Sequence, residues 1–323
     1  MAHRILVLGG GSIGTRHAKN LLDRGAGDVM IVDPDEARRT AAQQTLKIKA
    51  ESNEDRAFET FKPDIVFVCS PSAFHVPQAL KATERSAHVF IEKPLSHTLD
   101  GADHLRTVAS ATKRIVMVGC NMRFHPGPAA IKRLLDQGAI GEPIAARIAY
   151  RGFLPSWRPE QDYTKSYSAS VEQGGAVLDC IHEIDLALWY FGPGTVEGSA
   201  VVSASSIGLK TDGLAEILLR HNAGTLSSIH MNFIERAFCR RQHIAGTEGS
   251  LTWDYTKGAV ERTGADGKTV EVLTQSANFE ANHMYIAELD HFLDAVDRSA
   301  TPMGSLDEAI RALEVALAVS SRT

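Results

Sequence analysis

Cysteine, aromatic residues and closely spaced metal ligands are all scarce in this sequence of 323 residues. Aromatic residues make up 7% of the chain, and the four cysteines are Cys69, Cys120, Cys180 and Cys239. Because these cysteines are far apart, form no CxxC pair and lie in apolar stretches, we expect buried, reduced thiols. The 13 histidines show no HExxH or similar spacing, so the sequence predicts no metal site.

The chain also lacks a surplus of positive charge and any long apolar run. It has 34 Lys+Arg against 39 Asp+Glu, for a formal net charge of −5. Such a balance disfavours nucleic acid and anionic membranes as partners. No apolar run approaches the ~18–20 residues that cross a bilayer. The short apolar stretch after the N-terminus ends in glycines rather than a cleavage site, so we expect a cytoplasmic protein.

The first third of the chain alternates short apolar runs with segments of helical composition. The apolar runs lie at 5–8, 29–32, 65–69, 89–91 and 115–118, and helices are expected at 15–24, 35–45 and 77–84. Strands that are buried on both faces read as continuous apolar runs. This part therefore predicts a doubly wound parallel sheet of the Rossmann type, in an α/β domain over residues 1–122.

The pattern changes after residue 121. Strands are predicted at 143–150, 195–203, 214–220, 224–233, 242–246, 250–254 and 269–274, and helices at 127–137, 176–191, 283–299 and 306–320. Consecutive strands joined by glycine-containing turns indicate an antiparallel sheet. Residues 123–323 thus predict an α+β domain with an open, mostly antiparallel sheet.

The clearest motif is a glycine-rich turn between the first strand and the first helix. Gly9, Gly11 and Gly14 fit the pattern G-x-G-x-x-G, in which they allow a tight turn, close approach of a pyrophosphate, and close helix packing. Asp33 ends the second strand, where a carboxylate accepts hydrogen bonds from an adenosine ribose and favours NAD over NADP. Arg38 and Arg39 follow it, so NADP stays possible. A methyltransferase that uses S-adenosylmethionine has similar features.

Several further motifs are specific in combination. Glu92-Lys93-Pro94 follows the strand at 89–91, and Ser70-Pro71-Ser72-Ala73-Phe74-His75 follows the strand at 65–69. A Gly174-Gly175 pair precedes His182 and Asp185. Three more motifs occur at Gly119 to Pro126, at Gly246 to Leu251, and at Tyr285, Glu288 and Phe292. Over essentially its whole length the chain resembles the glucose-fructose oxidoreductase/inositol dehydrogenase family, written Gfo/Idh/MocA.

This resemblance implies an oxidoreductase that transfers a hydride between a nicotinamide cofactor and a secondary hydroxyl of a sugar, polyol or sugar derivative. Lys93 looks like the lysine that holds the reacting hydroxyl, and His182 like the residue that transfers the proton. A histidine pKa of ~6.5 suits that role. Many members carry an aspartate four residues before the histidine, but that position is Leu178 here. We therefore expect Asp179 to be the acid on the substrate side and Asp185 to orient the histidine or serve structurally, with all three on one helix.

The remaining predicted site residues follow from the same motifs. The expected cofactor contacts are Gly9, Gly11, Ser12, Ile13, Gly14, Asp33, Ser70, Pro71, Ser72, His75, Glu92, Lys93 and Asn121. The expected substrate contacts are Lys93, Arg123, Trp157, Arg158, Tyr163, Asp179, His182 and Arg236. Arg236 is included on the hypothesis that one of Arg236, Arg240 and Arg241 binds an acidic substrate; a solvated face or a salt bridge between subunits is the alternative.

Three functional classes stay open from the sequence. The first is the sugar or polyol dehydrogenase. The second is a glycosidase or epimerase that uses tightly held NAD for transient oxidation, and the third is a dinucleotide sensor without catalysis. Both Lys93 and His182 are present, and a sensor needs no proton relay. The family resemblance further implies a homodimer or homotetramer formed through the C-terminal sheet.

Overall fold

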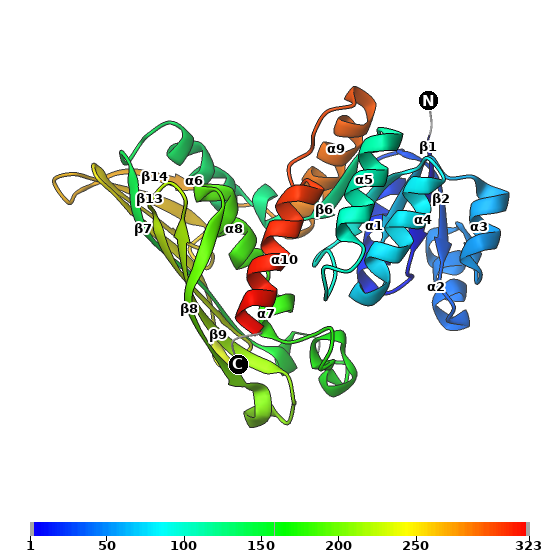
Figure 1. Ribbon diagram of the computed structural model, residues 1–323, viewed down its shortest axis with the longest axis horizontal. Helices are drawn as coiled ribbons and strands as arrows, with labels where there is room; N and C mark the ends of the chain where they lie inside the picture. The colour runs from blue at the N-terminus through cyan, green and yellow to red at the C-terminus, as the bar shows by residue number, and fades with distance from the viewer. Residues whose placement is uncertain (1–2, 158, 321–323) are drawn as a thin grey trace. The chain divides into compact units, whose positions relative to one another are not determined.

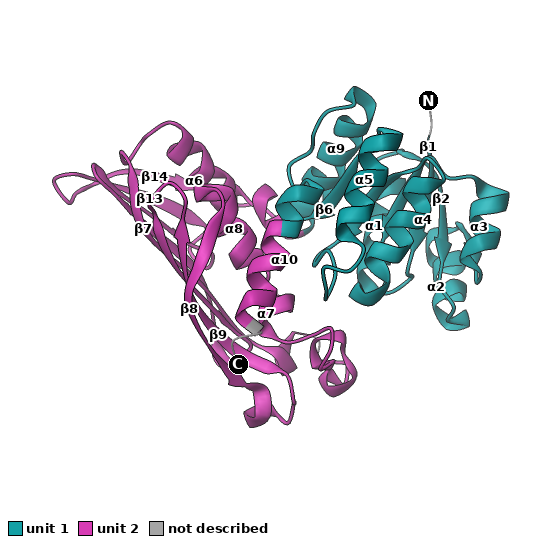
Figure 2. Ribbon diagram, viewed as in Figure 1, with its two compact units in different colours: residues 1–120, 282–310 teal, residues 121–281, 311–323 magenta. Residues whose placement is uncertain are grey.

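The structure is a computed structural model that describes residues 3–157 and 159–320. The chain folds as two compact units (Figure 2). Unit 1 runs up to Cys120 and includes Asn282–Ile310; unit 2 comprises Asn121–Ala281 and the residues from Arg311 onward. This division differs from the predicted domains at 122/123, because a segment late in the sequence packs with the first unit.

Unit 1 contains a parallel sheet of six strands with the order β3-β2-β1-β4-β5-β6. Its strands are β1 (His3–Leu8), β2 (Gly27–Val32), β3 (Lys49–Glu51), β4 (Ile65–Val68), β5 (His88–Glu92) and β6 (Val116–Gly119). β1, β4 and β5 are neighbours, so the loops after these strands emerge along one edge. The predicted doubly wound parallel sheet is confirmed. β3 was not predicted, because its three residues are not buried and carry no apolar run.

Helices cover this sheet (Figure 1). They are α1 (Ser12–Asp23), α2 (Glu36–Leu46), α3 (Glu54–Phe61), α4 (His75–Glu84), α5 (Ala102–Thr112) and α9 (Asn282–Arg298). α9 belongs here because Phe292 packs edge-on against Phe67 and Phe90, with ring centroids 5.6 Å away from both. The short 3-10 helix η1 (Ser72–Phe74) precedes α4, and α10 (Leu306–Ser320) begins in unit 1 and continues in unit 2.

Unit 2 contains a sheet of eight strands with the order β14-β13-β12-β11-β7-β10-β9-β8. The strands are β7 (Pro143–Phe153), β8 (Gly194–Ser203), β9 (Asp212–His221), β10 (Leu226–Asn232), β11 (Ile234–Gly246), β12 (Gly249–Asp254), β13 (Ala259–Gly264) and β14 (Thr269–Thr274). All pairs are antiparallel except β7 with β10. This confirms the predicted open, mostly antiparallel sheet; β13, with a single large apolar residue, was missed.

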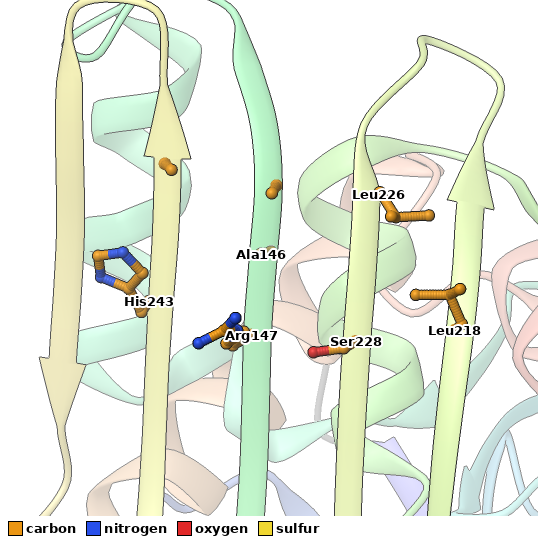
Figure 3. Close-up of a pocket in the computed structure, with 8 residues that line it drawn as sticks. Ala146, Arg147, Leu218, Leu226, Ser228 and His243 are labelled. Atoms are coloured by element: carbon orange, nitrogen blue, oxygen red, sulfur yellow. The ribbon is translucent and has the colours of Figure 1, made fainter. Parts of the chain in front are cut away.

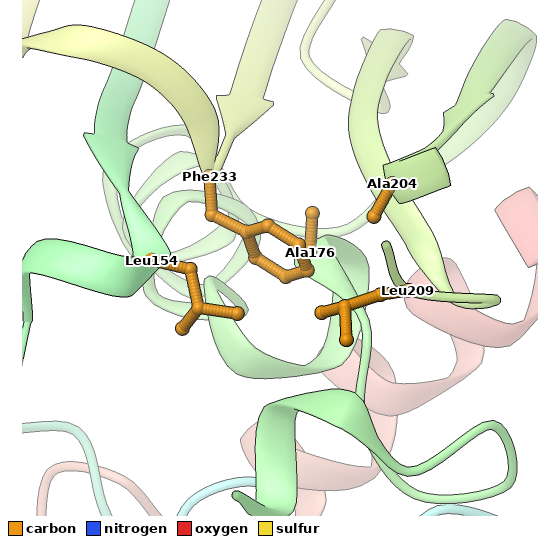
Figure 4. Close-up of a cluster of buried hydrophobic side chains, with 5 residues drawn as sticks. All are labelled: Leu154, Ala176, Ala204, Leu209 and Phe233. Atoms are coloured by element: carbon orange, nitrogen blue, oxygen red, sulfur yellow. The ribbon is translucent and has the colours of Figure 1, made fainter. Parts of the chain in front are cut away.

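One face of the unit 2 sheet is buried beneath helices. These are α6 (Pro126–Asp136), α7 (Ala176–Asp179) and α8 (His182–Phe191). The connections of unit 2 also contain the 3-10 helices η2 (Asn121–Phe124), η3 (Leu154–Ser156), η4 (Tyr163–Lys165), η5 (Tyr167–Ala169) and η6 (Ala204–Ile207). Along β7, Ala146 and Ile148 are buried, whereas Ala145 and Arg147 are exposed. Leu154 and Phe233 pack with Ala176 of α7 beneath the end of the sheet (Figure 4).

The helix predicted at 176–191 is in fact two helices, so that prediction was wrong. α7 ends at Asp179, and α8 begins at His182 after a turn through Cys180 and Ile181. At the start of α7, Val177 N donates a hydrogen bond of 2.8 Å to the Asp212 carboxylate of β9. Because α7 ends at Asp179 and α8 begins at His182, these two residues do not share the face of a continuous helix.

Candidate active site

The three fingerprint glycines of unit 1 each have a different environment. A Cβ on Gly14 would lie 1.9 Å from Gly9 O, and one on Gly9, whose φ is +100°, would lie 2.6 Å from Cys69 O. A Cβ on Gly11 would meet nothing within 4 Å. Gly9 and Gly14 are thus required by packing, while Gly11 leaves open space at the N-terminus of α1. No side chain caps that helix, and its first N–H groups suit an anion such as a pyrophosphate.

Asp33 is buried at the end of β2 and is 2% exposed. Its Oδ2 accepts a hydrogen bond from Gly10 N at 2.7 Å, and its Oδ1 accepts one from Asp35 N at 2.8 Å. Arg38 Nη1 lies 3.4 Å from Oδ2, while Arg39 Nη1 donates to the Asp33 carbonyl. The carboxylate therefore belongs to the glycine turn, where a ribose hydroxyl would reach it.

The loops after β4 and β5 are joined by His75. Its Nδ1 lies 2.9 Å from Pro94 O and its Nε2 lies 2.7 Å from Ser70 O. Burial lowers the pKa of His75, and its contacts with the two carbonyl oxygens partly offset that effect. Ser70 Oγ donates to Gln78 at 2.6 Å, and Ser72 is buried. Although predicted as a cofactor contact, His75 makes internal contacts that hold the Lys93–Pro94 segment beside the Ser70 loop.

Glu92 is a buried carboxylate directly before Lys93. Its Oε1 lies 2.6 Å from His17 Nε2, and its Oε2 accepts from Lys93 N at 3.2 Å. Burial alone would raise the pKa of Glu92, but the His17 hydrogen bond and the nearby positive charges leave it below its ordinary value. His17 is 0% exposed, and its ring packs against Phe67 and Phe90. This pair fixes the start of the segment that carries Lys93.

Unit 2 begins with two residues predicted for the site, Asn121 and Arg123. Asn121 Oδ1 is buried and has no hydrogen-bond partner among the residues that the structure describes. Arg123 forms a bidentate pair with Asp185, with Nε to Oδ2 at 2.9 Å and Nη2 to Oδ1 at 2.6 Å. Their side chains are 1% and 2% exposed. Asp185 therefore anchors the Arg123 side chain, and the substrate contact of Arg123 stays a prediction.

Asp179 and His182 are both half-buried at the junction of α7 and α8. The Ser168 hydroxyl donates a hydrogen bond to Asp179 Oδ2. Glu183, the next residue after His182, is fully buried and pairs with Arg240 of β11, whose Nε lies 2.8 Å from Glu183 Oε1. The turn between the two helices thus carries Asp179 and His182, and the charge of the adjacent Glu183 is neutralised by Arg240.

The loop after β7 holds three more predicted substrate contacts. Trp157 is 38% exposed and packs edge-on against Tyr150, with centroids 6.0 Å apart. Tyr163 donates its hydroxyl to Ile207 O at 3.0 Å, a contact internal to unit 2. Arg158 lies outside the described residues. Of the three, Trp157 is the one whose position suits a ligand contact.

The three arginines of β11 have different surroundings. The Arg236 guanidinium lies 4.4 Å from the centre of the Phe153 ring, and Arg240 is held by Glu183. Arg241 pairs in register with Ala149, the strand neighbour of Tyr150 that faces the other side of the sheet. The Arg236 side chain is thus held against the Phe153 ring, and its substrate contact stays a prediction.

Two residues near the predicted site were not singled out in the sequence. His17 lies on α1, three residues after Gly14, and Tyr150 lies near the end of β7. No local sequence pattern marks His17, because its partner Glu92 is 75 residues away. Tyr150 follows an apolar run and reads as an ordinary strand residue. Both become visible only when strands and helices are assembled.

Membrane-spanning helices and metal-binding clusters are both absent from the part of the chain that the structure describes. No helix within 3–157 and 159–320 is both long and apolar enough to span a bilayer. In the same residues, no group of three or more His, Cys, Asp or Glu side chains is arranged to hold a metal ion.

Comparison with known families gives matches to both units. A model described as "Oxidoreductase family, NAD-binding Rossmann fold" matches residues 3–120, and one described as "GFO/IDH/MocA C-terminal domain" matches residues 129–252. An oxidoreductase match decides against the methyltransferase alternative. The chain is 27% identical, over 331 aligned positions, to scyllo-inositol 2-dehydrogenase (NAD(+)) of Bacillus subtilis, covering 98% of this chain and 93% of that protein.

Two further proteins show the same relationship. Myo-inositol 2-dehydrogenase of Thermotoga maritima is 31% identical over 262 aligned positions, covering 78% of this chain and 75% of that protein. The crystal structure of myo-inositol 2-dehydrogenase from Lactobacillus plantarum superposes with a TM-score of 0.84 at 22% identity, covering 99% of this chain and 97% of that one. Sequence and fold agree that the chain belongs to the Gfo/Idh/MocA family of oxidoreductases.

Proposed function

We propose that the protein is an NAD-dependent dehydrogenase that oxidises or reduces a secondary hydroxyl of a sugar or polyol. The observation that carries the proposal is the position of Lys93. It follows β5 on the sheet edge where the glycine turn follows β1, and β4 alone lies between these strands. A lysine at that edge is suited to hold a hydroxyl beside a bound dinucleotide.

The glycine turn fits such a cofactor. Gly11 has open space on the side where a pyrophosphate approaches, and Asp33 ends β2 as a buried carboxylate. A 2′-phosphate would be repelled by Asp33, so NAD is the favoured cofactor, with Arg38 as the group that would allow NADP. When bound, the nicotinamide accepts or supplies the hydride, and the chain's own residues position the hydroxyl and move one proton.

In the oxidative direction, the Lys93 ammonium donates a hydrogen bond to the substrate hydroxyl oxygen and stabilises negative charge as the O–H bond breaks. His182 accepts the proton from that hydroxyl. Asp179, which accepts the Ser168 hydroxyl, contacts the substrate from the end of α7. These roles are carried over from the family's motif, and the inositol dehydrogenases among the relatives support them.

The test is a panel of inositols, sugars and sugar acids with NAD and NADP, followed by the absorbance of reduced nicotinamide. Lys93→Met keeps the apolar stem and removes the charge, so kcat is expected to fall about 10²–10⁴-fold, while NADH still binds as measured by its fluorescence. Lys19→Met, an exposed lysine on α1, is the matched control. Undiminished turnover by Lys93→Met contradicts the proposal.

The same panel separates the other classes. A glycosidase or epimerase with transient oxidation would convert substrate while tightly bound NAD shows no net reduction, and a sensor would bind dinucleotide without any turnover. Net formation of NADH that depends on Lys93 is the result expected here.

We further propose a homodimer or homotetramer in the cytoplasm. The uncovered face of the unit 2 sheet has a shallow depression of about 430 Å³. Its lining includes Leu218, Leu226, Ala145, Arg147 and His243 (Figure 3). An apolar patch with a polar surround is typical of a subunit interface. All four cysteines are free thiols, in keeping with a reducing compartment.

A further inference from the structure

A small aromatic group stands on the helix-covered face of unit 2, beside the turn that carries Asp179 and His182. Its centre is Tyr150, opposite Arg240 in the β7–β11 register. Trp157 and Phe238 both pack edge-on against the Tyr150 ring, with centroids 6.0 and 6.2 Å away. Trp157 is 38% exposed and Phe238 49% exposed, so two large apolar side chains flank one phenol without being buried themselves.

Phe238 lies within an irregular part of β11. The register against β7 shifts between Ile234 and Cys239, and Asn232 Oδ1 holds the start of the shifted segment by accepting from Ile234 N at 2.8 Å and Glu235 N at 3.0 Å. Bulges of this kind redirect side chains and are frequent beside binding sites. Phe238 is two residues before Arg240, the register partner of Tyr150, so both side chains lie on the Tyr150 face of the strand.

Two polar atoms converge in front of this aromatic group. A Cβ on Gly152 would lie 2.8 Å from Tyr150 Oη and 3.1 Å from Trp157 Nε1. Among the described residues, neither the phenol hydroxyl nor the indole N–H has a hydrogen-bond partner. Both are donors, and the phenol also accepts. A ligand oxygen in front of Gly152 would therefore meet two donors next to exposed aromatic faces, which is the combination that a sugar ring requires.

The charges around this group decide the kind of ligand. Arg240, 5.0 Å from the Tyr150 ring, is paired with Glu183, and Arg123 is paired with Asp185. Asp179 adds a carboxylate at the end of α7, and the Arg236 guanidinium stacks on the Phe153 ring. The guanidinium at the Tyr150 ring is thus already paired, so a ligand carboxylate or phosphate would find no free counter-ion in Arg240.

We infer that Tyr150, Trp157 and Phe238 form a subsite for a neutral carbohydrate, in which Tyr150 Oη and Trp157 Nε1 bind a hydroxyl of the substrate that does not react. The inference rests on the proposed function and narrows its substrate class to neutral sugars and polyols. A ligand carboxylate or phosphate is disfavoured at this subsite, because the Arg240 charge is already paired with Glu183.

The first test uses Tyr150→Phe, which keeps the ring and removes the hydroxyl. KM for the neutral substrate is expected to rise about 10-fold or more, since a lost hydrogen bond leaves its partner unpaired, with a smaller change in kcat. The matched control is Tyr255→Phe, which removes a phenol hydroxyl from another tyrosine that contacts Phe238 and is expected to leave KM unchanged. Thermal melting of each variant verifies folding.

A thermodynamic cycle makes this test specific. Deoxy analogues of the substrate are assayed with the wild type and with Tyr150→Phe. At the hydroxyl that Tyr150 binds, the substitution and the deoxygenation have effects that do not add, because each removes the same hydrogen bond. Additive effects at every hydroxyl overturn the inference.

Gly152→Ala is a second, independent probe. The glycine has no backbone angle that requires glycine, so the added methyl group acts through Tyr150 Oη and Trp157 Nε1, which it displaces. We expect a KM rise similar to that of Tyr150→Phe with an unchanged melting temperature. An unchanged KM in both variants overturns the subsite.

The substrate class is tested with matched pairs such as glucose with glucuronate and an inositol with its phosphate. The neutral partner is expected to have at least a 10-fold higher kcat/KM; equal or higher values for the acidic partner overturn the inference. Quenching of tryptophan fluorescence by a neutral polyol, lost in Trp157→Phe, reports binding without turnover. If the polyol binds but no NADH forms, the proposed function is contradicted and the subsite is not. If NADH forms with the same KM after substitution of Tyr150 and Trp157, the subsite is contradicted and the proposed function is not.

Discussion

His17 illustrates how a single residue supports the segment that carries Lys93. It is fully buried on α1, and its Nε2 lies 2.6 Å from Glu92 Oε1. Without that contact the buried Glu92 carboxylate would keep the longer hydrogen bond from Lys93 N but lose its side-chain partner. A buried charge that has lost its partner lowers the stability of the fold. The pair therefore holds the end of β5 in place without adding a large net attraction.

We predict that His17→Leu lowers the free energy of unfolding by about 3–5 kcal/mol, because it leaves Glu92 buried without its partner. Urea denaturation measures this. Lys19→Ala on the same helix removes the exposed Lys19–Asp23 pair, whose side chains are 63% and 59% exposed, and should change stability by less than about 1 kcal/mol. Equal losses in the free energy of unfolding for the two variants would show that the buried pair stabilises the fold no more than the exposed one.

At the scale of elements, α6 begins with an unusual cap. His125 precedes Pro126, and its Nδ1 accepts a hydrogen bond from Gly127 N at 3.0 Å. The ring is 1% exposed and packs against Trp253 and Phe279. Burial, together with the charge of Arg240, lowers the pKa of His125 to about 4. The cap works only while Nδ1 carries no proton.

This geometry predicts acid sensitivity. In the unfolded chain His125 takes up a proton near pH ~6.5, but in the folded protein not until about pH 4. Stability is therefore fully present above pH ~6.5 and is lost as pH falls toward 4, by up to about 3 kcal/mol. His125→Asn keeps an acceptor for Gly127 N without titrating. Urea denaturation from pH 4.5 to 7.5 measures the free energy of unfolding at each pH, and this free energy should depend less steeply on pH in the variant than in the wild type. An equal pH dependence in the two proteins would contradict the role given to His125.

At the scale of the whole molecule, the uncovered face of the unit 2 sheet exposes apolar side chains that a partner subunit could cover. Leu218 is 38% exposed in the middle of β9, in register with Ser228 of β10. Regular strands that alternate buried and exposed residues leave this face open along its length. Covering it with a second copy would remove its apolar area from water.

We predict that Leu218→Glu shifts the protein from an oligomer toward a monomer, because two such faces would bury carboxylates against each other. Light scattering coupled to size-exclusion chromatography measures the mass. Val171→Glu is the control, since Val171 is 68% exposed in the loop after β7 and away from the sheet. A monomeric wild type, or equal masses for all three proteins, would contradict the proposed interface.

Local patterns were enough for much of unit 1. The G-x-G-x-x-G turn, the strand before it and Asp33 after β2 lie within a short stretch, and their chemistry depends on neighbours in sequence. Lys93 was found because it directly follows a buried strand. The fold class and both sheets could be predicted in the same way, since most strands have apolar residues of their own; β3 and β13, which have few, were missed.

Long-range pairings were decided by the tertiary structure alone. Arg123 and Asp185 are 62 residues apart, and His17 and Glu92 are 75 apart, so no local pattern links them. Asp212 on β9 binds the start of α7, and Phe292 packs α9 into unit 1. The sequence determined which residues carry chemistry; the assembled structure decided which charges are neutralised and which groups stay exposed, because burial and pairing depend on contacts that only folding creates.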